Sequence, residues 1–385
     1  MTAHLRAYFS HPRSLAVGGV FASIGFLFGN WVTLIPYIKA KFALDDAQLG
    51  LLLLSMPFAS TLANPVAALI INRFGMKNAT IYGLLTMTLA YALPVNMPHL
   101  WLTALALMLA GAALATTNVA VNTCVHSIEQ HEKRSIMSTS HGMFSVGGML
   151  GAAFASTLMG LHAPVLWHVV SASGLVLVVG ILVRKPILGI YEEKNLQTQG
   201  AKFAWPKGIL LGMIAISLCI NLTEGVMADW TAVFMREVVE ADDFFIGWAF
   251  SCYALLMAVG RFTGDWLIPK YGPNRILEVG GITAAAGILL AVLSAQTLAS
   301  IMGFGLVGAG VSCGAPILYG GAARLPNMAK GAGLATMNTF SIAGFLVGPA
   351  IIGFISKAAN LSFAIGLVAI LGLLWAFLAR KIELY

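Results

Sequence analysis

Apolar residues occur in long runs of about 20, separated by short polar connectors, and a helix of that length crosses the hydrocarbon core of a bilayer. The runs are continuous rather than alternating, which favours helices over a transmembrane barrel. Six spans are predicted at 15–38, 48–71, 79–96, 100–124, 136–160 and 164–183. Six more are predicted at 208–236, 245–268, 276–294, 298–322, 331–355 and 361–380.

Composition supports this all-α membrane fold of twelve transmembrane helices. The chain is 59% hydrophobic and 10% charged, whereas soluble domains carry about 25% charged residues. So few charges cannot cover a water-facing surface, which excludes a soluble globular protein. The net charge of +7 resides in short connectors and does not indicate nucleic-acid binding.

The distribution of Lys and Arg predicts the orientation in the membrane. With both termini in the cytoplasm, most of the 22 basic residues fall in cytoplasmic segments. The opposite side then holds only Lys39, Lys41, Arg236 and Lys357. Because cytoplasmic loops are enriched in Lys and Arg, we expect cytoplasmic termini.

The two halves of the chain repeat one another, which is typical of secondary transporters. We therefore expect two pseudo-symmetric six-helix bundles, at 1–184 and 208–385, joined by a cytoplasmic linker at 185–207. The matching dipeptides are Asn30-Trp31 with Asp229-Trp230, Leu49-Gly50 with Ile246-Gly247, Phe74-Gly75 with Tyr271-Gly272, and Phe144-Ser145 with Phe340-Ser341.

Two connectors carry a family resemblance. The connector after the second span, 68–78, reads ALIINRFGMKN, and the one after the eighth, 260–275, reads GRFTGDWLIPKYGPNR. Both resemble the short loop motif of the major facilitator superfamily, although Asn72 stands where an Asp is usual. Three stretches are similar to its bacterial fucose-permease-like branch, namely NWVTLIPYIKAKFALDDAQLGLLLL from Asn30, HGMFSVGGMLGA from His141 and EGVMADWTAVFMR from Glu224.

This resemblance implies a secondary transporter of the inner membrane that moves a small polar, sugar-like solute by alternating access, with proton symport. Proton-driven efflux of an amphipathic metabolite or drug is an alternative. The fifth span lacks the Gly-Pro motif usual in efflux antiporters, which weakens that alternative. A membrane sensor or scaffold that transports nothing is a second alternative.

Acidic residues within the seventh span are the candidates for proton coupling. Glu224 lies near its middle, and intramembrane carboxylates usually face a polar interior and relay protons. Asp229 is about 7.5 Å along the axis and about 140° around it, so it shares the face of Glu224 only if the helix is distorted at Gly225. His141, which titrates near neutral pH, is the third candidate. Structural hydrogen bonding is the alternative for Glu224 and His141, and anchoring of the outer end of the helix together with Trp230 is the alternative for Asp229.

Amide and indole side chains are the candidates for binding the solute, since amides both donate to and accept from hydroxyl groups. Hydrogen bonds between helices and anchoring of Trp at the membrane interface are the alternatives. The residues are Asn30, Trp31, Asn118, Asn122, Asn221 and Asn338.

Charged residues of the two loop motifs are the candidates for gating. Arg261 and Asp265 are spaced i, i+4 near the inner end of the eighth span, and we expect them to pair with each other or to bond a facing helix end, and so to hold the inner gate. Arg73 occupies the first copy of the motif.

No nucleotide-binding loop, metal-ligand cluster or nucleophile triad is found in the sequence. We therefore expect no enzyme activity, no cofactor and no metal. The expected partners are a small-molecule solute, protons and the lipid bilayer, without nucleic acid, and the protein is expected to be a monomer.

Overall fold

The computed structural model describes residues 2–192, 205–325, 332–382 and 384, with the side chains of 2–5, 265 and 335 left out. The first half contains α1 (Thr2–Ser10), α2 (Pro12–Lys41), α3 (Asp46–Leu53), α4 (Ser55–Phe74), α5 (Met76–Tyr91), the 3-10 turn η1 (Pro94–Asn96), α6 (Leu100–Glu132), α7 (Met137–Gly160) and α8 (Val165–Leu188). The second half contains α9 (Ile209–Glu237), η2 (Asp243–Phe245), α10 (Trp248–Tyr271), α11 (Pro273–Ser294), α12 (Thr297–Val311), α13 (Gly314–Ala323), α14 (Ala332–Ala358) and α15 (Leu361–Lys381).

Each predicted span corresponds to a helix or a helix pair. Within the described residues, 11 helices are long and apolar enough to cross a membrane. The third predicted span is α5, which has 16 residues and is shorter than the usual transmembrane length. The second span is divided at Leu54 into α3 and α4, and the tenth is divided into α12 and α13. The short helix α1 was not predicted.

The two loop motifs adopt the same backbone conformation. Gly75, between α4 and α5, has φ 80° and ψ 150°, and Gly272, between α10 and α11, has φ 81° and ψ 151°. Because such positive φ values favour glycine, both turns require the residue that the repeat provides. The repeat in the sequence is therefore a repeat in the backbone.

Helix packing follows the same repeat. In the first half, α2 packs on α7 and α8, and α6 packs on α4 and α5. In the second half, α9 packs on α14 and α15, and α12 packs on α10 and α11. Each pair of the first half thus has its counterpart in the second, as a pseudo-symmetric six-helix repeat requires.

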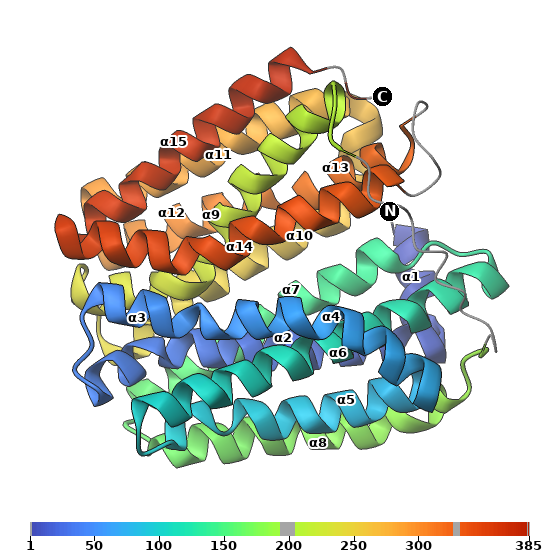
Figure 1. Cartoon of the computed structure of the whole chain (residues 1–385), viewed down its shortest axis with the longest axis horizontal. Coiled ribbons are helices and arrows are strands. Elements are labelled where there is room, and N and C mark those ends of the chain that lie inside the picture. The colour runs from blue at the N-terminus through green and yellow to red at the C-terminus, as the bar shows by residue number, and fades with distance from the viewer. Residues whose placement is uncertain (1, 193–204, 326–331, 383, 385) are drawn as a thin grey trace.

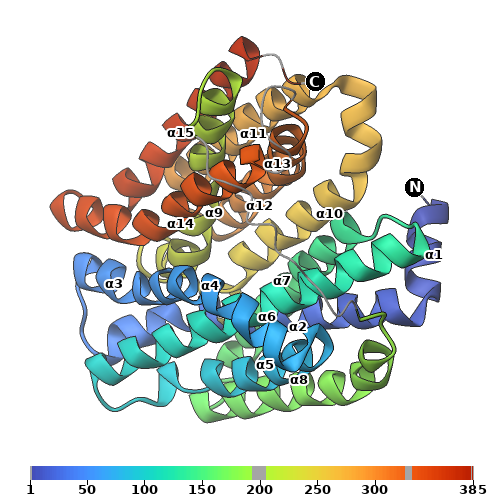
Figure 2. The ribbon, with the colours of Figure 1, turned by 45° about the vertical axis from the view of Figure 1, so that its right-hand side comes forward.

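The halves contact each other chiefly through α3 with α14, α7 with α10, and α2 with α9. Figures 1 and 2 show both termini at one end of the molecule, and the two halves diverge toward that end. We call the opposite end, formed by residues 39–50, 156–163, 236–247 and 349–360, the distal face. Contacts between the halves are concentrated there and along α7 and α10.

Candidate functional site

Helix α9 carries both predicted carboxylates into one cavity. Glu224, Gly225, Ala228 and Asp229 all line it, although α9 is helical without interruption from Ile209 to Glu237. The two acids lie about 140° apart around the axis, but Gly225 and Ala228 occupy the arc between them and have almost no side chain. The expectation that a distorted helix is needed to bring the acids together was therefore wrong.

The central cavity, as we call it, lies between the two halves and has a volume of about 400 Å³. Helices of the first half supply Trp31, Asn64, Asn118 and Ser145, and helices of the second half supply Tyr253, Arg261 and Phe345 in addition to the acids. Its volume falls within the range of small-molecule sites.

Neither carboxylate is held by the protein. Glu224 and Asp229 form no hydrogen bond or ion pair with a described residue. Ionisable groups inside a membrane protein are costly and usually pair with one another or with backbone carbonyl groups. Two acids that face an open cavity without a protein partner are available to protons and to a solute.

Arg261 lines the same central cavity and reaches from α10 to α7. Its Nη1 donates hydrogen bonds to the backbone oxygen of His141 (3.3 Å) and to Ser145 Oγ (2.9 Å). Pairing with Asp265 was one expectation, and the side chain of Asp265 lies outside the described residues. The other expectation, a bond to a facing helix end, agrees with the contacts to His141 and Ser145 near the start of α7. The gating role of Arg261 remains a prediction.

Aromatic and amide groups form much of the remaining wall. Phe28, Phe144, Phe250 and Phe345 line the cavity together with Trp31, and Phe28 lies against both Phe144 and Phe250, with ring centroids 6.2 Å apart in each pair. Polar atoms come from Asn64, Asn118, Ser60 and Thr61. The wall thus combines apolar ring faces with groups that bind hydroxyls.

Two further predicted residues lie at the edge of the central cavity. Asn122 Nδ2 donates to Asn118 Oδ1 at 2.6 Å, and Asn122 Oδ1 lies 3.2 Å from His141 Nε2. His141 is also in ring contact with Phe21. These contacts link α6 to α7 and connect the cavity-lining Asn118 to His141 indirectly.

Besides Asn122 and His141, four predicted residues are not among those that line the cavity. Asn221 Nδ2 donates to the backbone oxygen of Ser341 at 2.9 Å, so it ties α9 to α14. Asn30 lines a small separate cavity with Tyr91. Asn338 is exposed, and the exposed Arg73 lies over the ring of Phe74. Helix-joining contacts, the alternative that we gave for the amides, describe Asn221 well.

Several lining residues were not selected from the sequence as solute-binding. They include Ser145, Phe144 and Tyr253. The repeat of Phe144-Ser145 with Phe340-Ser341 was the available signal for the first two. The position of Tyr253 in the lining could not be predicted from a repeat or a charge pattern, because an aromatic residue on an apolar helix is as compatible with lipid as with a cavity.

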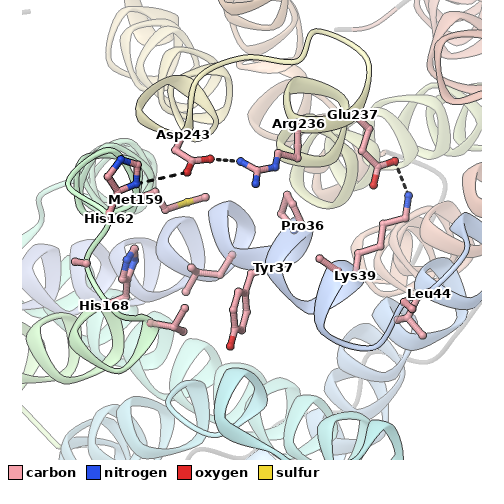
Figure 3. A pocket seen from close by; sticks show the side chains of 15 residues that line it. Pro36, Tyr37, Lys39, Leu44, Met159, His162, His168, Arg236, Glu237 and Asp243 are labelled. Carbon is pink, nitrogen blue, oxygen red and sulfur yellow. Dashed lines mark hydrogen bonds and ion pairs between the residues drawn. The ribbon is translucent and has the colours of Figure 1, made fainter.

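Paired charges hold the halves together at the distal face. Lys39 Nζ of α2 pairs with Asp46 and, at 2.5 Å, with Glu237 of α9. Asp46 also accepts a hydrogen bond from Ser356. Figure 3 shows Lys39 against Glu237, and Asp243 between Arg236 and His162. A depression of about 780 Å³ is lined by Lys39, His162, Arg236, Glu237 and Asp243 and shares no lining residue with the central cavity.

Glycine lets the backbones of the two halves approach closely at the distal face. A Cβ atom added at Gly50 of α3 would lie 2.5 Å from the Pro349 oxygen and 3.2 Å from Ala350 Cα of α14. At α7, Ser156 Oγ donates to the Phe244 oxygen (2.6 Å) and accepts from the Gly247 amide (2.9 Å). The distal face is therefore closed, and we call these contacts the distal seal.

Comparison with known proteins adds the family context. The family model for the Major Facilitator Superfamily matches residues 16–239 and 208–383. An uncharacterized MFS-type transporter of Yersinia pestis is 33% identical, over 91% of this chain and 91% of that protein. The class C tetracycline resistance protein of Escherichia coli is 26% identical over 63% of each chain.

Solved structures share the fold at low sequence identity. The structure of a D-xylose-proton symporter superimposes with a TM-score of 0.75 and 13% identity, covering 96% of this chain and 98% of that one. The E. coli fucose:proton symporter FucP gives a TM-score of 0.62 and 16% identity, covering 96% and 98%. The fold expected from the sequence is confirmed.

Proposed function

Because the chain belongs to the major facilitator superfamily, and is thus a multi-pass membrane transporter rather than an enzyme, we propose that it is a proton-coupled symporter for a small polar, sugar-like solute. The protein acts in the inner membrane with both termini in the cytoplasm. Units 1–184 and 208–385 move relative to each other, joined by the linker 185–207, of which residues 193–204 lie outside the described structure.

One observation carries this proposal. Two carboxylates, Glu224 and Asp229, face a cavity between the halves and have no hydrogen-bond partner among the described residues. A group that must take up and release a proton in each cycle needs access to the solute path and no permanent counter-ion. Glu224 lines the cavity and has no hydrogen-bond or ion-pair partner among the described residues, so it is our candidate for the coupling residue.

The closed distal seal gives the direction of access. With cytoplasmic termini, the distal face is external, so this conformation is inward-facing. Two lining residues of the cavity, Asn64 and Asn118, are exposed, which supports access to the cavity in this conformation. Opening the distal seal while the inner ends of the helices come together would expose the same cavity to the outside, as alternating access requires.

The test uses purified protein in proteoliposomes. Counterflow is screened with radiolabelled L-fucose, D-xylose and D-gluconate. Uptake of the solute that exchanges is then measured under a pH gradient that is acidic outside. Wild-type protein should accumulate it. In Glu224→Gln, pH-driven accumulation should fall to the level of protein-free liposomes while counterflow persists, because exchange of solute does not require net proton movement.

The control removes the same charge elsewhere. Glu240→Gln lies in the exposed connector after α9 and should leave accumulation unchanged. Accumulation by Glu224→Gln at the wild-type rate would remove the coupling role from this residue. Failure of counterflow for the whole panel would favour the membrane sensor or scaffold.

Drug or metabolite efflux is a second candidate, favoured by the similarity to the tetracycline resistance protein and by the aromatic wall of the cavity. Efflux by proton antiport predicts the opposite response to the gradient. A protonophore-sensitive loss of an amphipathic dye from the liposomes, rather than uptake of a polar solute, would support efflux.

A further inference from the structure

Arg261 is a cation inside the membrane-spanning region whose contacts leave part of its hydrogen-bonding capacity unused. The two acceptors on α7, the His141 oxygen and Ser145 Oγ, are both neutral and both bind Nη1. A guanidinium has five N–H donors in a planar fork. Among the described residues, no carboxylate pairs with it, and the edge formed by Nε and Nη2 donates to no protein acceptor.

This edge belongs to a residue that lines the central cavity. An arginine whose only role was to join α10 to α7 would not need to line the solute path. Intramembrane charges are usually compensated by a partner. For a guanidinium with a vacant planar edge, the best-matched partner is a carboxylate bound through two parallel hydrogen bonds.

The charge balance of the cavity leads to the same ligand. Glu224, Asp229 and Arg261 are the charged groups in its lining, and no ion pair joins them to one another. With both acids ionised the sum is negative, and with both protonated it is positive. Uptake of protons therefore changes a cavity that repels an anion into one that attracts it.

Building on the symport function proposed above, we propose that the transported solute is a hydroxylated carboxylate, in the class of sugar acids, and that Arg261 binds its carboxylate group. Asn64, Asn118, Ser60 and Thr61 are the hydrogen-bonding groups available to its hydroxyls, and the aromatic wall is available to its carbon skeleton. A neutral sugar would leave the planar edge of the guanidinium without a carboxylate.

Binding is tested separately from transport by thermal shift of the detergent-purified protein. The probes are matched pairs with the same carbon skeleton: D-gluconate with D-sorbitol, D-galactonate with galactitol, and D-xylonate with xylitol, together with D-glucosamine. At least one acid should raise the melting temperature, and its alditol should not. Stabilisation by an alditol or by D-glucosamine, with none by any acid, would overturn the assignment.

Variants locate the carboxylate. Arg261→Gln should abolish the shift caused by the acid, and Arg261→Lys should weaken the apparent affinity by about tenfold or more, because an ammonium is a point donor that cannot form the bidentate pair. Ser145→Ala removes one anchor of the guanidinium but keeps its charge, so binding of the acid should persist. Equal acid binding by wild type and Arg261→Gln would show that the carboxylate binds elsewhere.

Arg236→Gln is the matched control, since Arg236 pairs with Asp243 at the distal face and lines only the distal depression. Loss of acid binding in this variant, but not in Arg261→Gln, would place the anion site outside the central cavity. The two proposals fail separately. Acid binding without pH-driven accumulation removes proton coupling alone, and pH-driven uptake of a neutral sugar by Arg261→Gln removes the sugar-acid assignment alone.

Discussion

The distal seal and the central cavity treat charge in opposite ways. At the seal, Lys39 is neutralised by Asp46 and Glu237, and Arg236 by Asp243. In the cavity, the lining residues Glu224, Asp229 and Arg261 form no ion pair with a described residue. The charged groups of the seal thus pair with one another, whereas those of the cavity remain available to a proton and a solute.

The difference follows from what each region has to do. A gate needs contacts that form in one conformation and break in another, and partly exposed ion pairs of modest strength meet that need. A transport site must change its charge with each cycle, so a permanent counter-ion would compete with the proton and the solute. The predictions below test whether the paired charges and close contacts of the seal keep the distal face closed, in contrast to the unpaired charges of the cavity.

The same distance measurement is used for each prediction below. Spin labels at Leu51→Cys on α3 and Phe354→Cys on α14, both exposed positions, report the distance across the seal by pulsed electron paramagnetic resonance. The four native cysteines, Cys124, Cys219, Cys252 and Cys313, are replaced first. A longer distance means an open distal face.

The largest effect is expected for Gly50→Leu. Its side chain would collide with the backbone of α14 at Pro349 and Ala350, and overpacking of this kind costs about 1–3 kcal/mol or more, so the open-to-closed ratio should rise by about 100-fold. Gly174→Leu is the matched control, because a Cβ atom there meets nothing within 4 Å. An unchanged distance distribution in Gly50→Leu would mean that α3 and α14 do not form the seal.

An intermediate effect is expected for Lys39→Met. Removing the ammonium leaves Asp46 and Glu237 from opposite halves without their shared partner, so the open-to-closed ratio should rise by about tenfold. Lys41→Met is the control, since Lys41 donates only to the Val95 and Met97 oxygens of its own half. Equal shifts in the two variants would contradict a bridging role for Lys39.

The smallest effect is expected for Asp45→Asn. Asp45 pairs with Lys357 of the other half at 2.9 Å, and both side chains are exposed to a large extent. Asparagine keeps the cap that Asp45 provides for α3 through the Gln48 amide, so only the charge is lost. The open-to-closed ratio should change by less than about twofold.

The pH dependence of this pair has a defined sign. The hydrogen bond from Lys357, followed by that from the Gln48 amide, lowers the pKa of Asp45 below its ordinary value. Its contribution to closure is therefore complete above about pH 4, the ordinary Asp pKa, and is lost only as the pH falls through the lowered value. A distance change in wild type near neutral pH that Asp45→Asn abolishes would contradict this.

The helices could be predicted because their signal is local. Span 136–160 became Met137–Gly160, and span 208–236 became Ile209–Glu237, since an apolar run of sufficient length is helical in a bilayer whatever it packs against. The loop glycines Gly75 and Gly272 were also recognisable, because a positive φ leaves a trace in the residue type. The division at Leu54 and the short α5 left no such trace.

The candidate site could be predicted only in part. Glu224, Asp229, Trp31 and Asn118 reach the cavity, and each was chosen because a polar or indole group in an apolar run is unusual. The same criterion selected Asn221, which instead joins α9 to α14. An amide on an apolar helix indicates that a polar partner exists but does not identify it, because the partner comes from another helix.

The sequence by itself determined the number of spans, the internal repeat and the presence of acids within the seventh span, since these depend on residues near one another in the chain. Tertiary structure decided which helix faces meet across the two halves. That step brings Arg261 into the same cavity as the acids and lets Gly225 and Ala228 open the space between Glu224 and Asp229. The physical reason is that a cavity is defined by atoms missing between helices, and no single helix encodes them.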